Sequence, residues 1–169
     1  MKKILIIGSP GTGKSTLAVQ LARKTSLPVI HLDKYWHDQS LWSKDLPQKK
    51  QQWRKYIHKL VKQEDWIMDG NYTSTLDIRI PDADFVIFLD YPRRIALLRT
   101  IKRRAKYRKV QRPGMPDGWQ EKFNLGLLKK IWSFNESHKP RIEALLSTKH
   151  KDQYVHLKTP RETKIFLAK

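Results

Sequence analysis

One stretch near the amino terminus has the residue types and spacing of a phosphate-binding loop. Residues 8–15 match the pattern G-x-x-x-x-G-K-[ST] and follow an apolar run at 3–7. Glycines let consecutive backbone N–H groups face phosphate oxygens, and the helix expected next adds free N–H donors. We expect Lys14 to act catalytically on the β- and γ-phosphates of ATP, and the Ser15 hydroxyl to ligate Mg²⁺. The alternative is a glycine-rich turn without a ligand. The predicted nucleotide-binding residues are Gly8, Ser9, Pro10, Gly11, Thr12, Gly13, Lys14, Ser15 and Thr16.

Carboxylates follow two other apolar runs, where strands are expected to end. Asp33 follows the run 27–32, and Asp69 follows the run 66–68. An acid beside a phosphate loop can orient Mg²⁺, so we predict a metal site made of Asp69 and Ser15. Asp33 is the candidate to orient or deprotonate an acceptor hydroxyl. The alternative for both acids is a turn former or a helix cap.

The apolar patterns predict strands that alternate with helices in one domain, residues 1–169. Strands are expected at 3–7, 27–32, 66–68, 84–89 and 154–157. Helices are expected at 14–25, from Pro47, from Pro92, at 123–146 with a break near Pro140, and from Pro160. This alternation predicts an α/β fold, a parallel sheet with helices on both faces. Ligands of such sheets bind at the carboxyl ends of the strands.

Composition and charge limit the classes of function. The chain has no cysteine, which excludes thiolate zinc sites and suits a cytoplasmic protein, and no apolar stretch is long enough to span a membrane. The spacing of His31 and His37 fits no strong metal site. Net charge is +19, and residues 91–169 carry 21 basic and 6 acidic side chains. This field favours an anionic partner, either small-molecule phosphates or a nucleic acid; the alternative is a solvated surface.

A basic segment at about 103–120 has the features of a lid. It contains Pro and Gly and lies between two predicted helices. Closure would bring Arg103, Arg104 or Arg112 onto the γ-phosphate, with Arg141 joining from the next helix. Arginine suits this catalytic role because it stays charged and donates in a fixed fork. The alternative is a solvated face or a nucleic-acid surface.

The acceptor is expected between Asp33 and Asp69. An acceptor-side insertion at about 34–65 covers this place and is rich in aromatic residues. Trp36 is a candidate to stack on a base or sugar, whereas Trp53 lies on an apolar helix stripe and is expected in the core.

These residues together resemble the adenylate-kinase-like group of P-loop kinases, over most of the chain. Asp69-Gly70 resembles their D-G pair, and Asp90-Tyr91-Pro92 with Arg99 and Arg103 resembles their strand-four exit and arginine-bearing helix. The resemblance implies a P-loop NTPase three-layer sandwich, with five parallel strands in the order 2-3-1-4-5 and a helical lid. It also implies that Arg103 touches the transferring phosphates, and that Arg99 and Lys158 lie near the nucleotide base.

The acceptor side resembles and departs from known kinases. Asp33 is similar to the strand-end Asp of shikimate and gluconate kinases, which helps position Mg²⁺ or the acceptor hydroxyl. Adenylate kinases follow D-G with F-P-R, whose arginine grips the acceptor phosphate. Here Asn71-Tyr72-Thr73 stands at that place, and Arg79 is the candidate substitute. The predicted acceptor-binding residues are therefore Asp33, Trp36, Asp69, Gly70 and Arg79.

A second set of motifs is similar to the bacterial DNA topology modulation proteins, which are small relatives of adenylate kinases. These motifs are residues 66–72 with Arg79, Arg112-Pro113 followed by Trp119 and Phe123, residues 132–134, residues 139–141, and residues 156–158 before Arg161. The family name asserts an effect on DNA and not a demonstrated reaction.

Two classes of function follow from the sequence. The first is a kinase that moves the ATP γ-phosphate onto a nucleotide, nucleoside or other small acceptor. The second is a nucleic-acid-binding P-loop ATPase, which the basic half of the chain favours. The paired strand-end acids and the lid-like segment favour the kinase, because a passive binder does not require them.

Overall fold

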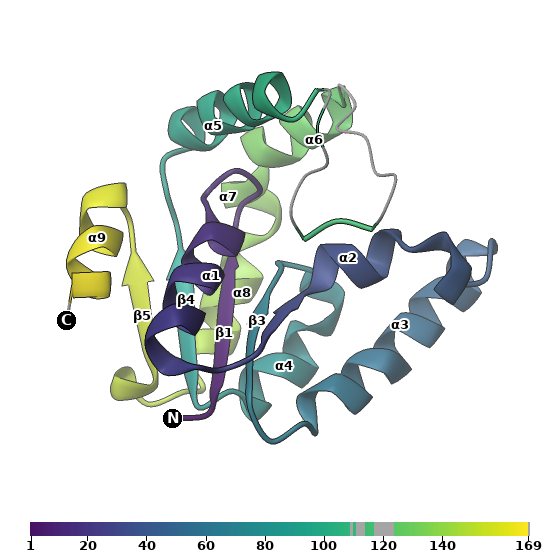
Figure 1. The fold of residues 1–169 in the computed structure, drawn as a ribbon, viewed down its shortest axis with the longest axis horizontal. Helices are drawn as coiled ribbons and strands as arrows, with labels where there is room; N and C mark the ends of the chain where they lie inside the picture. The colour runs from purple at the N-terminus through teal and green to yellow at the C-terminus, as the bar shows by residue number, and fades with distance from the viewer. Residues whose placement is uncertain (109, 111–113, 117–123, 169) are drawn as a thin grey trace.

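A computed structural model of the chain describes residues 1–108, 110, 114–116 and 124–168. Within them, five strands form one sheet in the order β2-β3-β1-β4-β5, and all neighbouring strands are parallel (Figure 1). The strands are β1 (Lys3–Gly8), β2 (Val29–His31), β3 (Trp66–Asp69), β4 (Phe85–Leu89) and β5 (Tyr154–Leu157). The predicted strand order is confirmed.

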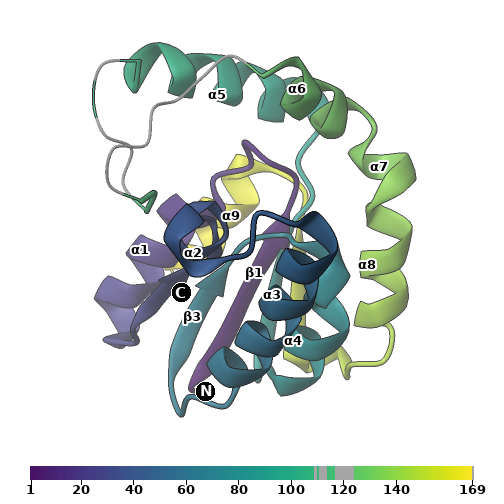
Figure 2. The same ribbon diagram turned by 90° about the vertical axis from the view of Figure 1, so that its right-hand side faces the viewer.

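Helices cover both faces of the sheet and its carboxyl edge. In the packing of the two cores, α1 and α9 lie on one face, while α3, α4 and α8 lie on the other. Above the carboxyl ends of the strands lie α5 and α6 (Figure 2). The helices are α1 (Lys14–Thr25), α2 (Leu32–His37), α3 (Leu46–Val61), α4 (Leu76–Asp82), α5 (Arg93–Lys106), α6 (Leu125–Trp132), α7 (Phe134–Ser137), α8 (Lys139–Leu146) and α9 (Pro160–Ala168). Short 3-10 turns are η1 (Gln39–Leu41), η2 (Thr73–Thr75) and η3 (Lys151–Gln153).

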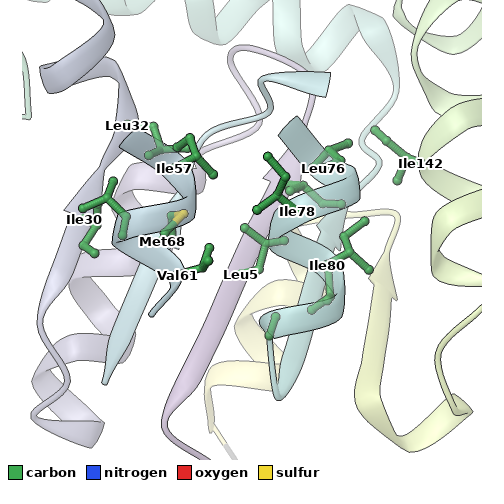
Figure 3. Packing of buried hydrophobic residues seen from close by; sticks show 14 of the residues in the cluster. Leu5, Ile30, Leu32, Ile57, Val61, Met68, Leu76, Ile78, Ile80 and Ile142 are labelled. Atoms are coloured by element: carbon green, nitrogen blue, oxygen red, sulfur yellow. The ribbon is translucent and has the colours of Figure 1, made fainter. Parts of the chain in front are cut away.

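The central strand β1 divides the apolar side chains between two cores. Leu5 and Ile7 pack with residues of α3, α4 and α8, whereas Ile4 and Ile6 pack with residues of α1. Figure 3 shows the first core, in which Leu5 lies among side chains from α3, α4 and β3. Each fully buried Leu or Ile contributes about 1.5–3 kcal/mol, so β1 is held firmly where the phosphate loop begins.

Three elements differ from the sequence-based expectations. The second strand ends at His31, and Leu32 already begins α2. The helix expected at 123–146 consists of α6, α7 and α8, with the last break at His138, before Pro140. The seven-residue helix α4 was not predicted, because it is short and contains Pro81. These boundaries matter for function because α2 and the loop before α4 carry cavity residues.

No helix within the described ranges is long and apolar enough to cross a bilayer.

Candidate nucleotide and acceptor site

The phosphate loop connects β1 to α1 at the carboxyl edge of the sheet. Gly8 and Gly11 have φ angles of 142° and 83°, which other residues rarely adopt. A Cβ at Gly8 would overlap the carbonyl group of Leu89 in β4. A Cβ at Gly11 would overlap the carbonyl oxygen of Ala96 in α5. Glycine at these positions therefore lets the loop pack against both β4 and α5.

Polar side chains brace the loop. The Thr12 hydroxyl donates to the Ser9 carbonyl over 2.8 Å, and Arg99 Nη1 donates to the Thr12 carbonyl over 3.0 Å. Lys14 Nζ donates to the carbonyls of Gly8 and Ser9, at 3.0 and 2.9 Å. The ammonium thus lies directly over the loop, where it can transfer from carbonyl oxygens to phosphate oxygens.

Asp69 ends β3 and receives two side-chain hydrogen bonds. Ser15 Oγ donates to Asp69 Oδ2 over 2.6 Å, and His31 Nδ1 lies 2.7 Å from Asp69 Oδ1. The parallel register puts Asp69 opposite Ile6 of β1 on one side and opposite His31 of β2 on the other. Only 4 % of Asp69 is exposed, so its carboxylate is held almost without water. The sheet therefore brings the predicted metal pair Ser15 and Asp69 into direct contact.

The chemistry of this pair fits Mg²⁺. A hydroxyl and a carboxylate are the hard oxygen donors that Mg²⁺ prefers, and nucleotide-bound Mg²⁺ fills its other positions with phosphate oxygens and water. Within the part of the chain that the structure describes, no cluster of three or more His, Asp or Glu side chains is placed to hold a metal. Ser15 and Asp69 are thus the side chains here that could hold Mg²⁺.

Asp33 lies in the first turn of α2 and is braced from the neighbouring strand. The Tyr72 hydroxyl donates to Asp33 Oδ1 over 2.8 Å. Burial, together with the negative charge of Asp33, raises the pKa of Tyr72, so this phenol remains a hydrogen-bond donor. Tyr72 also has a φ of 21°, an uncommon value for a non-glycine residue. Strained backbone of this kind concentrates at functional sites.

Arg79 does not reach the acceptor place, which corrects the prediction. Its side chain is wholly buried, and it does not line the cavity described below. Its guanidinium donates to the carbonyls of Gly70, Asn71 and Tyr72 over 2.8, 2.8 and 2.9 Å. Burial lowers the pKa of Arg79 to about 9, which still leaves the side chain charged at neutral pH. Arg79 is buried because its guanidinium supplies hydrogen-bond donors to the carbonyl groups of the loop after β3. It therefore stabilises that loop and does not face the cavity.

The predicted residues meet around one cavity of about 1330 Å³. It lies between the phosphate loop, the carboxyl ends of β2 and β3, and α5 and α6. Predicted residues that line it are Pro10, Gly11, Gly13, Lys14, Ser15, Thr16, Asp33, Trp36, Asp69, Gly70, Arg99 and Arg103. Gly8, Ser9 and Thr12 do not line it, because Ser9 and Thr12 are buried and Gly8 lies against Leu89.

Trp36 lies in the cavity wall but is also part of an aromatic cluster. Its ring packs edge-on against Trp53 at 5.3 Å and tilted against Tyr72 at 5.6 Å. Lys49 Nζ lies 4.3 Å from the ring centroid of Trp36. Trp53 is 1 % exposed and belongs to the core, as the apolar stripe predicted. These contacts hold the Trp36 ring in place in the cavity wall, on the same helix as Asp33.

The arginines predicted at the site, Arg99 near the nucleotide base and Arg103, Arg112 and Arg141 in catalysis, separate into three groups. Arg99 and Arg103 line the cavity from α5. Arg112 lies outside the described residues. Arg141 is half exposed, does not line the cavity, and its Nη2 lies 3.9 Å from Asp77 Oδ1. The prediction for Arg141 is corrected because α8 packs on a face of the sheet beside α4, and not above its carboxyl edge.

Two residues at the end of the sheet also lie outside the cavity lining. The backbone N–H of Lys158 donates to Glu162 Oε2 over 2.8 Å. The predicted contact of Lys158 with adenine stays a prediction. Asp90 Oδ2 receives Lys139 Nζ at 2.6 Å and lies 2.8 Å from His156 Nε2. The Asp90 carboxylate therefore links β4, β5 and α8.

Sequence reasoning missed several residues of the site. Asn71 is buried, and its Oδ1 accepts from the Gly8 N–H at 3.4 Å, which ties the loop after β3 to the phosphate loop. His31 was considered only as a metal ligand, whereas it contacts Asp69. The signal that could have found both is their position directly beside strand-end acids. The other cavity residues that were not predicted are Val19, Gln20, Arg23, His37, Gln39, Tyr72, Tyr107, Met115, Asn124, Gly126, Leu127 and Lys130.

Solved structures similar to this chain include several kinases. Shikimate kinase from Bacteroides thetaiotaomicron aligns with a TM-score of 0.63 and 18 % identity, over 98 % of this chain and 93 % of that one. Shikimate kinase from Acinetobacter baumannii, in complex with shikimate, gives 0.62 and 14 %, over 99 % and 90 %. Deoxyadenosine kinase from M. mycoides, with products dCMP and a flexible dCDP bound, gives 0.53 and 15 %, over 98 % and 96 %. Identities this low establish a shared P-loop kinase fold and nothing finer.

Sequence comparisons give the family. Among curated proteins no sequence matches this chain significantly. Residues 4–124 match the protein family described as "AAA domain", a range that contains the phosphate loop, both strand-end acids and α5. Because this match covers more than half of the chain, the chain belongs to that AAA domain family.

Proposed function

We propose that this protein transfers the γ-phosphoryl group of ATP, as its Mg²⁺ complex, to a small acceptor. One observation carries the proposal: Lys14, the hydrogen-bonded pair Ser15 and Asp69, and Asp33 line one cavity. A site that only binds nucleotide needs the loop and the metal pair. A second carboxylate, braced separately across the same cavity, is what a reaction with an acceptor hydroxyl requires.

The phosphate loop would hold the β- and γ-phosphates. Its N–H groups and the amino-terminal end of α1 favour negative charge, and no acidic residue stands in the first turn of α1 to oppose it. Lys14 would exchange its carbonyl partners for phosphate oxygens. Mg²⁺, when bound, would supply positive charge that neutralises the phosphates. Ser15 and Asp69 are the side chains that would hold it.

Transfer would proceed across the cavity toward Asp33. The acceptor oxygen forms a bond to the γ-phosphorus, the bond from phosphorus to the β,γ-bridging oxygen breaks, and ADP leaves. Asp33 accepts the proton of the acceptor hydroxyl. Arg103, which lines the cavity from α5, is placed to neutralise charge on the transferring group. If the acceptor is instead a phosphate, Asp33 has no proton to accept, so the reaction would be insensitive to that carboxylate.

The acceptor class is a nucleotide, a nucleoside or another small hydroxyl compound. The first compounds to test are shikimate, which one similar kinase holds, and deoxycytidine, the nucleoside part of the product dCMP that another holds. Residues 66–72 and 156–158 resemble motifs of the bacterial DNA topology modulation proteins. We therefore also propose that this chain is a relative of those proteins.

The test is ADP release with ATP, Mg²⁺ and a panel of nucleoside monophosphates, nucleosides, sugar acids and polyols. We expect one class to raise ADP release above the rate with water alone, and mass spectrometry to show an acceptor heavier by one phosphoryl group. A protein that binds Mg²⁺–ATP while no acceptor raises turnover would contradict the kinase proposal.

A nucleic-acid-binding ATPase is the second candidate, and the outer side of α5 favours it. Helix α5 carries seven Lys or Arg residues and no acid, and Arg99 and Arg103 are the two of these that line the cavity. The guanidinium of Arg93 lies 4.1 Å from the ring centroid of Trp132 in α6, and 54 % of Trp132 is exposed. Cations beside an exposed aromatic ring are typical of single-strand binding surfaces.

Salt dependence tests this second candidate. Affinity for single-stranded DNA should fall steeply between 50 and 200 mM salt, as expected when several phosphate contacts release counterions (about 10³-fold or more). Trp132→Ala should weaken it further, by about 1–3 kcal/mol. Weak DNA binding that changes neither with salt concentration nor in Trp132→Ala would contradict the proposal of a nucleic-acid-binding ATPase.

A further inference from the structure

The two carboxylates of the cavity are braced in a crossed arrangement between β2 and β3. Asp69 ends β3, and its Oδ1 contacts His31 at the end of β2. Asp33 follows β2, and its Oδ1 accepts from Tyr72, which follows β3. Each acid is therefore held from the neighbouring strand or from the loop that follows it: Asp69 by His31 of β2, and Asp33 by Tyr72 in the loop after β3. Asp69 is assigned to Mg²⁺ binding, and Asp33 to proton transfer. The side chains that hold them, His31 and Tyr72, should therefore affect different properties of the protein.

We infer that His31 is a positioning residue, which holds Asp69 in the orientation that ligates Mg²⁺ and so sets the affinity for the magnesium–nucleotide complex. The inference rests on the first half of the proposed function, namely that Ser15 and Asp69 hold nucleotide-bound Mg²⁺. It does not depend on the acceptor or on transfer.

The geometry explains why a second partner is needed. A carboxylate turns about the bond that joins it to Cβ, which exchanges its two oxygens. The Ser15 hydroxyl donates to Oδ2 over 2.6 Å and would keep this hydrogen bond while one of its lone pairs faces a metal, so it holds only one of the two oxygens. The contact of Oδ1 with His31, at 2.7 Å, fixes the second oxygen. Since a carboxylate only accepts, His31 Nδ1 carries the proton of this hydrogen bond.

The imidazole is itself fixed. His31 ends β2 in register with Asp69, and the next residue, Leu32, is fully buried. A Cβ built at Gly114 would lie 3.1 Å from both Cγ and Cδ2 of His31, so the chain at Gly114 packs closely on the ring. The side chain of His31 is 21 % exposed. A ring held by strand register and by the packed Gly114 can hold a carboxylate in turn, as partners of metal ligands do elsewhere.

The chain offers a matched control. His156 lies 2.8 Å from Asp90 Oδ2, and its side chain is 26 % exposed, close to the value for His31. Neither His156 nor Asp90 lines the cavity. A variant that removes the His156–Asp90 contact therefore measures what the loss of a His–Asp contact costs the fold, while the metal site stays unaltered.

The experiment measures the affinity of a non-hydrolysable ATP analogue with Mg²⁺ and with EDTA. For the unaltered protein we expect tighter binding with Mg²⁺. His31→Leu should reduce affinity in Mg²⁺ by about 10-fold or more, as partners of metal ligands commonly do, and leave affinity in EDTA unchanged within about 2-fold. His31→Asn should restore most of the loss, because its amide nitrogen reaches the place of Nδ1. His156→Leu should keep the full Mg²⁺ effect.

Three outcomes overturn the inference. They are an unchanged Mg²⁺ effect in His31→Leu, an equal loss in His156→Leu, and a protein whose analogue affinity ignores Mg²⁺ altogether. If His31→Leu does not fold, the comparison passes to His31→Asn and His31→Gln, since Gln places its amide farther out and should not rescue. The unaltered protein could bind the analogue more tightly with Mg²⁺, and lose this gain in His31→Leu, while no acceptor raises turnover. That result would contradict the proposed kinase reaction but would support the role of His31.

Discussion

At the scale of single residues, hydrogen-bond partners separate the roles of two like-charged side chains. Asp69 is held by Ser15, which directly follows Lys14 at the start of α1, and by His31. Asp33 is held by Tyr72, whose burial keeps it protonated. Two carboxylates in one cavity can thus serve metal binding and proton transfer without exchanging roles.

Replacement of Asp33 tests its role as the base. Asp33→Asn keeps the shape of the side chain and removes its capacity to accept a proton. For a hydroxyl acceptor we expect transfer to fall by about 10²–10⁴-fold, with analogue affinity in Mg²⁺ unchanged. Single-turnover transfer and equilibrium binding, measured on the same preparation, check this. Transfer at the original rate would remove Asp33 from the chemistry.

Sequence reasoning found the residues with a recognisable pattern and misplaced those without one. The phosphate loop, Asp33 and Asp69 were predicted, because glycine spacing and strand-end acids are local signals. Arg79 was misplaced because nothing local shows that its guanidinium faces three buried carbonyls. His31 was missed as a brace because its partner is 38 residues away in the sequence.

At the scale of elements, α3 supports the acceptor side of the cavity. Trp53 on α3 contacts the rings of Trp36, Trp42 and Tyr72 at 5.3, 5.6 and 5.1 Å. Through these contacts, one buried ring sets the position of α2 and of the loop after β3. The elements that carry Asp33 and its brace therefore depend on a side chain outside the cavity.

Truncation of this ring should loosen both elements. Trp53→Ala should lower the free energy of unfolding by about 3–5 kcal/mol, the usual cost of a large core cavity. Chemical denaturation measures this loss. In the protein that remains folded, the apparent KM for the acceptor should rise more than the affinity for Mg²⁺–nucleotide falls. Trp132→Ala, at a half-exposed position, should change stability far less. Equal destabilisation by both variants would contradict the account of α3.

Element boundaries were the weaker part of the sequence-based expectations. The five strands were predicted because parallel strands buried on both faces form continuous apolar runs. The helix at 123–146 was predicted with one break near Pro140, but it is interrupted at both Ser133 and His138. The reason is tertiary: α6 packs with α5 and α8 packs with α4, and these places cannot be joined by one straight helix.

At the scale of the whole molecule, a net charge of +19 acts against the compact state. Carboxylates that are held by several donors offset part of this repulsion. Asp84 Oδ2 accepts from the backbone N–H groups of Lys2 and Lys3, at 2.7 and 3.1 Å, where β1 begins. These hydrogen bonds, the one from Lys2 first, lower the pKa of Asp84.

The pKa of Asp84 gives a pH dependence with a definite sign. Because its folded value lies below the unfolded one, its stabilisation is present above about pH 4 and is lost as pH falls through the folded value. Asp84→Asn should lower the melting temperature at pH 7 by about 2–4 °C. The difference from the unaltered protein should shrink in thermal melts as the pH falls below about 4. A difference that does not shrink as the pH is lowered below that value would contradict this assignment.

The central claim is that the loop at Gly8–Ser15 binds Mg²⁺–ATP through Lys14. Calorimetric titration of the unaltered protein and of Lys14→Met with Mg²⁺–ATP tests it most directly. We predict one saturable site with a Kd below about 1 mM for the unaltered protein, which corresponds to about −4 kcal/mol or better, and a loss of about 100-fold or more in Lys14→Met. Equal affinity of the two proteins, or no saturation at millimolar nucleotide, would contradict the account.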